Sequence, residues 1–207
     1  MPESIRLFIA IALTEELKAV LTEIGRELEA RIPPRIVRWV KPAAMHLTLV
    51  FLGETPISRL AAIKEAVGAA AASSPHTSFR AVGLGCFPNP RRPRVIWVGV
   101  EETAGDLPQI KEALDRELEP LGFRREKRTF SPHLTLGRVD RRASNHEVAE
   151  LGRVVERATL QEVGRVKVTQ VHLIRSDLRP AGPVYTILAS FPLARGHEVT
   201  EGTRNGV

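Results

Sequence analysis

The sequence predicts an α+β fold made of a duplicated, bilobal unit, with two antiparallel sheets that face a central cleft and carry helices on their outer faces. The tetrapeptide His-Leu-Thr-Leu occurs at residues 46–49 and again at residues 133–136. An apolar segment precedes each copy at nearly the same distance, at residues 6–11 and 95–100. In both halves the apolar patterns follow the order strand, helix, strand, helix, strand, which favours helices packed on one face of a sheet.

In the first half, short apolar runs indicate strands, and apolar residues at helical spacing indicate helices. Thr14 stands before two acidic residues and the first helical stripe, so it is suited to cap that helix. The predicted elements are a strand over residues 6–13, a helix from Thr14 to Pro33, a motif strand over 45–52, a helix from 56 or 58 to 73, and a strand over 79–84.

The second half repeats these signals. The predicted elements are a strand over residues 95–100, a helix over about 105–121, a motif strand over 131–139, a helix over 145–160, and a strand over 166–174. A final strand at 184–191 has no partner in the repeat. We therefore predict a single bilobal domain over residues 1–193, with pseudo-two-fold repeats at about 5–85 and 94–175. Residues 194–207 are polar and Gly-rich, and we expect a disordered tail there.

Composition and charge limit the kinds of protein and partner that fit this sequence. The 207 residues carry a formal net charge of +6, which favours anionic partners. Cys86 is the only cysteine, so an intramolecular disulfide and a Cys-rich metal cage are excluded, and a reducing cytosol suits the chain. No apolar run reaches the length of a membrane span. We expect a cytoplasmic, soluble monomer that binds no membrane.

The two motifs place histidine and threonine where they can act together. Successive side chains of a strand point to opposite faces, so His46 shares a face with Thr48, and His133 shares one with Thr135. One imidazole can act as a base while the other acts as an acid. Displacement at phosphorus is in line, which needs such groups on opposite sides of the phosphate, and threonine hydroxyls can donate to its other oxygens. The two histidines are interchangeable on these grounds.

Two alternatives compete with this interpretation. A histidine on a strand is often a hydrogen-bonded structural residue, although packing alone is served better by Leu, Val or Ile than by a ring whose nitrogens need partners. Metal binding needs three or four ligands, and neither motif has Asp, Glu or Cys beside it at ligand spacing. We therefore expect no metal and no other cofactor. The remaining histidines, expected at the surface or in the tail, are His76, His146, His172 and His197.

Basic residues flank the motifs. Lys41 lies five positions before His46, and Arg128 lies five positions before His133, which suggests two cations that bind substrate at the cleft. Arg138 is an odd number of residues from His133, so an unbroken strand would point it away from the cleft. Basic clusters that could contact RNA phosphates, or could be solvated surface, occur at residues 91–94, 124–128 and 141–142.

These residues resemble the two-histidine phosphoesterase superfamily and, within it, the RNA 2′,3′-cyclic phosphodiesterases, also known as 2′-5′ RNA ligases. The resemblance runs from about Arg6 to Leu193. Its marks include Val-Arg-Trp-Val-Lys-Pro at 37–42, Phe-Ser-Pro-His-Leu-Thr-Leu at 130–136, and further stretches at 6–11, 46–53, 87–95 and 182–185.

The resemblance implies a bilobal fold with a central water-filled cleft, and hydrolysis of the 2′,3′-cyclic phosphate ends of RNA or nucleotides to 2′-phosphates. It implies that His46 is the proton donor to the leaving 3′ oxygen and that His133 is the proton acceptor that activates water. Thr48 and Thr135 would hold the phosphate oxygens. Reversible 2′-5′ RNA ligation would be the same chemistry with a ribose hydroxyl in place of water.

Two other functions stay open at this point. The basic charge and the scarcity of aromatic residues would also suit a module that binds RNA ends without turnover. A phosphodiesterase for another small cyclic phosphate is equally compatible with the motifs, because they address the phosphate and not the base.

Overall fold

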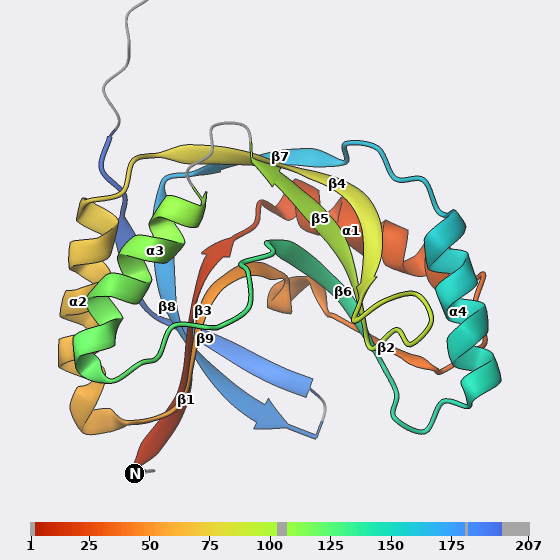
Figure 1. Ribbon diagram of the computed structural model, residues 1–207, viewed down its shortest axis with the longest axis horizontal. Helices are drawn as coiled ribbons and strands as arrows, with labels where there is room; N and C mark the ends of the chain where they lie inside the picture. Colours follow the sequence, from red (N-terminus) through yellow and green to blue (C-terminus); the bar gives the residue numbers. More distant parts are fainter. Residues whose placement is uncertain (1–2, 103–106, 181, 196–207) are drawn as a thin grey trace, which may run out of the picture.

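The computed structural model describes residues 3–102, 107–180 and 182–195. The described residues fold into one mixed α/β unit in which a curled, nine-stranded antiparallel sheet is covered by four α-helices (Figure 1). The strands are β1 (Ser4–Ala12), β2 (Val37–Trp39), β3 (His46–Pro56), β4 (Thr77–Phe87), β5 (Val95–Glu102), β6 (His133–Val139), β7 (Gly164–Val168), β8 (Gln170–Arg179) and β9 (Gly182–Pro192).

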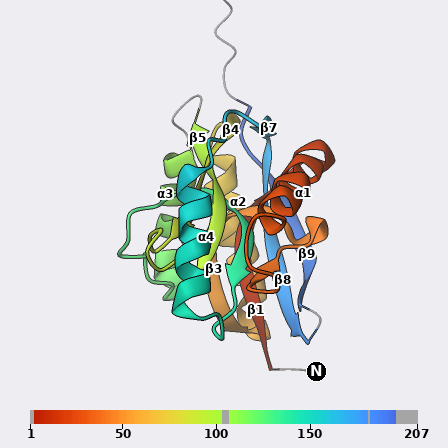
Figure 2. The same ribbon diagram turned by 90° about the vertical axis from the view of Figure 1, so that its right-hand side faces the viewer.

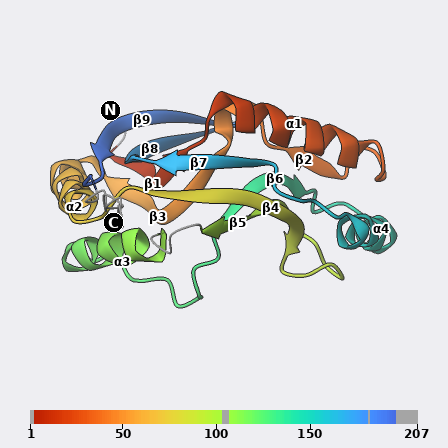
Figure 3. The same cartoon turned by 90° about the horizontal axis from the view of Figure 1, so that it is seen from above.

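The helices lie between these strands in sequence, and their bounds are α1 (Glu15–Glu29), α2 (Leu60–Ala72), α3 (Leu107–Leu118) and α4 (Asn145–Arg157), with short 3-10 helices η1 (Pro42–Ala44), η2 (Ile57–Arg59) and η3 (Glu119–Leu121). Thr14 caps α1 as predicted, because its side chain accepts a hydrogen bond from the backbone N–H of Leu17. Figures 2 and 3 show α1 and α3 on opposite sides of the strands, and Figure 3 shows α2 and α4 at opposite ends of the molecule.

The strand order is β7-β4-β5-β6-β3-β1-β8-β9, with β2 paired to β6. The prediction of two separate sheets is wrong, because β3 and β6 join both halves into one hydrogen-bonded sheet. They do so through a single residue pair, Leu47 with Leu134. The two motif strands are therefore neighbours at the centre of the sheet. In this order, β5, β4 and β7 lie on one side of them and β1, β8 and β9 on the other.

Several predicted elements differ from the observed ones. The helix expected from Thr14 to Pro33 ends at Glu29. The strand expected over 166–174 is two strands, β7 and β8, which break at Thr169 and pair with β4 and β1 in opposite parts of the sheet. The helix expected over 145–160 ends at Arg157. The helix expected over 105–121 is observed as α3 followed by η3, and its first residues, 105 and 106, lie outside the described residues, as does the expected tail beyond residue 195.

Burial in the main core shows which face of β3 and β6 is packed and which is available for a functional site. Leu47 and Leu49 of β3 and Leu134 and Leu136 of β6 are buried in it, packed under the helices. The alternate residues of the same strands are only half-buried. We call the side that carries His46, Thr48, His133 and Thr135 the histidine face, and the opposite side the helix face.

Candidate active site

The four motif side chains meet on the histidine face. Because β3 and β6 are antiparallel and Leu47 pairs with Leu134, the register directs His46 toward Thr135 and His133 toward Thr48. Each histidine thus lies diagonally from the other, with a hydroxyl from the opposite strand beside it. The structure brings together the four residues that the repeated motif predicts.

Both imidazoles are held by the same backbone hydrogen bond. The Nδ1 atom of His46 is 2.8 Å from the carbonyl oxygen of Ala44, and Nδ1 of His133 is 2.8 Å from the carbonyl oxygen of Ser131. A carbonyl can only accept, so Nδ1 carries the proton in both rings. This leaves Nε2 of each ring as the nitrogen that can accept or give a proton.

Aromatic rings surround each histidine. The ring of His46 lies 4.7 Å from that of Phe8 and 5.2 Å from that of Tyr185, centroid to centroid. The ring of His133 lies 4.9 Å from that of Phe87, which is in turn 5.1 Å from that of Trp97. Sequence reasoning did not assign a role at the site to these rings, because β1, β4, β5 and β9 are brought to the motifs only by strand pairing.

The surroundings of His46 favour its neutral form. Burial lowers the pKa of His46 from 6.5 to about 4, the hydrogen bond to Ala44 opposes the shift, and the positive charge of Arg138 adds to it. The rings of Phe8 and Tyr185 lie against the imidazole and form part of this enclosure. In the absence of an anion, His46 is therefore uncharged at neutral pH.

Arg138 was expected to point away from the motif histidines, and the structure corrects this. The pairing of β5 with β6 runs from Ile96–Gly137 directly to Trp97–Thr135, so Leu136 is an extra residue in a β-bulge. Leu136 and Gly137 both face the core. Arg138 follows them and therefore lies on the histidine face. A glycine inside a strand pattern is a signal for such a bulge, and Gly137 could have given it.

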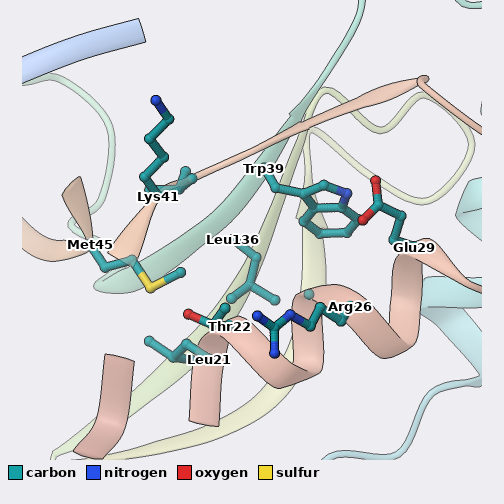
Figure 4. A pocket seen from close by; sticks show the side chains of 10 residues that line it. Leu21, Thr22, Arg26, Glu29, Trp39, Lys41, Met45 and Leu136 are labelled. Atoms are coloured by element: carbon teal, nitrogen blue, oxygen red, sulfur yellow. The ribbon is translucent and has the colours of Figure 1, made fainter. Parts of the chain in front are cut away.

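Lys41 and Arg128, the two predicted substrate-binding cations, are both exposed. Arg128 lies in the segment that leads into β6, and Lys41 precedes η1 at the rim of a pocket of about 230 Å³. Trp39, Met45 and Leu136 also line this pocket, which lies between α1 and the central strands on the helix face (Figure 4). In the described part of the chain, no hydrogen bond or ion pair joins either cation to a motif histidine. Substrate binding by these cations stays a prediction.

His172 was expected at the surface and is buried instead. Its Nδ1 atom lies 2.9 Å from the hydroxyl oxygen of Ser190, and it pairs with Ala10 across β8 and β1. His76 and His146 are exposed as expected, and His197 lies outside the described residues. Within the described ranges, no three His, Cys, Asp or Glu side chains gather as metal ligands would, and none of the helices has the length and apolarity needed to cross a membrane.

Comparison with known proteins gives a clear relationship. A family model described as LigT like Phosphoesterase matches residues 11–97 and again residues 98–185. The chain belongs to this family. An RNA 2′,3′-cyclic phosphodiesterase of Archaeoglobus fulgidus is 37% identical over 186 residues, which cover 90% of this chain and 99% of that protein.

Two solved structures agree with the fold. A crystal structure of a Thermus thermophilus protein superposes with a TM-score of 0.75 at 32% identity and covers 93% of this chain and 100% of its own. A crystal structure of Escherichia coli LigT complexed with NADP+ gives a TM-score of 0.70 at 26% identity, with 94% of this chain and 100% of that chain covered.

Proposed function

We propose that the protein hydrolyses the 2′,3′-cyclic phosphate ends of RNA or nucleotides to 2′-phosphates. The observation that carries this proposal is the matched pair of imidazoles, each with Nδ1 bound to a backbone carbonyl and Nε2 free on the histidine face. The name of the Archaeoglobus relative supports the same substrate. NADP+, which the Escherichia coli structure holds, carries a ribose 2′-phosphate, the group that the proposed reaction produces.

In the proposed mechanism, His133 takes a proton from the attacking water and His46 gives one to the leaving 3′ oxygen. The water oxygen bonds to phosphorus as the bond from phosphorus to the 3′ oxygen breaks, so the ribose keeps a 2′-phosphate. Each proton transfer can contribute roughly 10²–10⁴-fold to the rate. Thr48 and Thr135 donate hydrogen bonds to the phosphate oxygens that do not react. No metal or other cofactor takes part in these steps.

The environment of His46 fits the donor role once substrate is bound. A phosphate brought next to the ring favours the charged imidazole, because an opposite charge within a few ångströms raises the pKa of a histidine. Arg138 lies on the same face and can stabilise the phosphate charge. Lys41 and Arg128 are proposed to bind more distant parts of the substrate.

We also propose that the domain, residues 1–193, arose by duplication. The family model matches two consecutive segments, and the sheet order is balanced about β3 and β6. The repeats at about 5–85 and 94–175 would then form two lobes with the substrate in a central cleft. We further propose that the protein catalyses reversible 2′-5′ ligation. We also propose that it is a monomer and that it is cytoplasmic.

The test is phosphorus NMR of a nucleoside 2′,3′-cyclic phosphate with the purified protein in EDTA. We expect conversion to the 2′-phosphate by the wild type, and losses of roughly 10²-fold or more for His46→Ala and for His133→Ala. His76→Ala, which alters an exposed histidine, is the matched control and should keep full activity. Equal activity in all four proteins would refute the two-histidine mechanism, and a 3′-phosphate product would refute the proposed substrate orientation.

A further inference from the structure

A row of four residues crosses the histidine face from the first motif to the edge of the sheet. Ala10 of β1 pairs with Thr48 of β3 on one side and with His172 of β8 on the other. His172 pairs in turn with Ser190 of β9. Residues that lie opposite each other on paired antiparallel strands share a face. A third histidine therefore lies on the same face as the two motif histidines, two strands away from Thr48.

The second half of the sheet has no such residue. The same two steps across the strands lead from Thr135 to Trp97 of β5 and then to Gly85 of β4. The ring of Trp97 covers Gly85 so closely that a Cβ atom there would lie 2.3 Å from it. In the first half, Ala10 and His172 take these two places. Only the first motif therefore has an imidazole two strands from its threonine.

The ring of His172 is anchored at one nitrogen. Its Nδ1 atom lies 2.9 Å from the hydroxyl oxygen of Ser190, and the residue is only 5% exposed. Burial lowers the pKa of His172, so the ring is neutral at neutral pH. A neutral imidazole has one N–H donor and one acceptor nitrogen, so Nε2 carries the proton when the Ser190 hydroxyl donates to Nδ1. In the described part of the chain no residue bonds to this Nε2, which points away from Ser190.

The spacing of the strands determines what Nε2 can reach. Neighbouring strands lie about 4.8 Å apart, so the backbones of Thr48 and His172 are separated by about 10 Å. Ala10, between them, contributes only a methyl group, which leaves room above it for the two longer side chains to approach each other. The separation is too long for a direct hydrogen bond, and it suits one water molecule that bridges the two polar groups.

We propose that His172 is a positioning residue that orients the hydroxyl of Thr48 toward the phosphate. Nε2 of His172 donates to one water molecule, and this water donates to the hydroxyl oxygen of Thr48. The single proton of the Thr48 hydroxyl then points to a phosphate oxygen that does not react. This inference rests on the proposed function and adds to its site a residue that does not touch the substrate. The two motifs thus differ in how their threonines are held.

The test compares two substitutions of His172 in the hydrolysis of a nucleoside 2′,3′-cyclic phosphate. His172→Phe keeps a planar ring but removes both nitrogens, and it should lower kcat/KM by about 5-fold, as expected for loss of one hydrogen bond. His172→Gln keeps an N–H donor and should recover most of this loss. A role in packing alone predicts no such recovery, so equal losses in the two variants would refute the inference.

The two threonines provide a matched control for the same substitution. If His172 acts through Thr48, His172→Phe should have no further effect on kcat/KM in a Thr48→Val protein. It should keep its full effect in a Thr135→Val protein. Equal effects in both backgrounds, or no effect in the wild type, would show that the inference is wrong.

Two further measurements separate the possible failures. Ser190→Ala alters an exposed residue and removes the anchor of the His172 ring, so it should show the same dependence on Thr48 if His172→Phe does not fold. The affinity of the same variants for a nucleoside 2′-phosphate is measured without turnover. If the wild type does not hydrolyse the cyclic substrate, the proposed function is overturned. A loss of affinity that depends on Thr48 but not on Thr135 would still support the role of His172, and a loss that depends on neither would refute it.

Discussion

The protonation of His46 should depend on bound phosphate. Its pKa of about 4 in the free protein, against 6.5 for an exposed histidine, means that protonating this ring costs about 3 kcal/mol more than protonating an exposed one. One negative charge at about 4 Å, at an effective dielectric constant near 20, attracts the imidazolium by about 4 kcal/mol. The attraction therefore offsets the cost, and a bound nucleoside 2′-phosphate should raise the pKa of His46 to near neutrality or above.

NMR of the imidazole ring measures this directly across a pH titration, with and without the nucleotide. In the free protein, Arg138→Gln should raise the pKa of His46, because it removes a repelling positive charge. The lowered pKa also affects stability. The unfolded chain binds the His46 proton more readily, so this contribution is fully present above pH 6.5 and is lost as the pH falls toward 4. A free-protein pKa near 6.5, or no rise on binding phosphate, would refute the reasoning.

Three further predictions concern packing and chemistry. Gly152→Ala should destabilise the protein by about 1–3 kcal/mol in urea unfolding, because the added Cβ would lie 1.9 Å from the carbonyl oxygen of Pro90. Gly68→Ala is the control, since it also lies inside a helix but its Cβ would meet only a side chain, at 3.6 Å. This variant should raise the free energy of unfolding by up to about 1 kcal/mol. Equal effects would contradict this account of α4 packing. Thr48→Val and Thr135→Val should each lower kcat by about 10²-fold without loss of fold by circular dichroism. The rate should also pass through a maximum with pH, since one imidazole must be neutral and the other charged; a steady rise from pH 5 to 9 would contradict this.

Local patterns predicted the parts of the site that local geometry determines. His46 and Thr48 share a face because a strand alternates, and Thr14 caps α1 because a hydroxyl satisfies a free N–H at a helix start. Those rules depend on neighbours in sequence only. The repeated motif therefore predicted that the two histidines and the two threonines share one face of the central strands.

Features that depend on strand pairing could not be predicted in the same way. Periodicity does not reveal that β7 and β8, separated by Thr169 alone, join opposite parts of the sheet, so the apolar pattern predicts a single strand there. Arg138 was assigned to the wrong face because the bulge at Leu136 shifts the alternation by one residue. The enclosure of His46 by Phe8 and Tyr185 arises from three different strands.

The most direct test of the two-histidine account is an experimental structure of the protein with a nucleoside 2′-phosphate. The account predicts one phosphate group within hydrogen-bonding distance of Nε2 of both His46 and His133, with the Thr48 and Thr135 hydroxyls on its remaining oxygens and the ribose on the side of His46. A phosphate that reaches only one of the two Nε2 atoms, or that binds away from the histidine face, would contradict it.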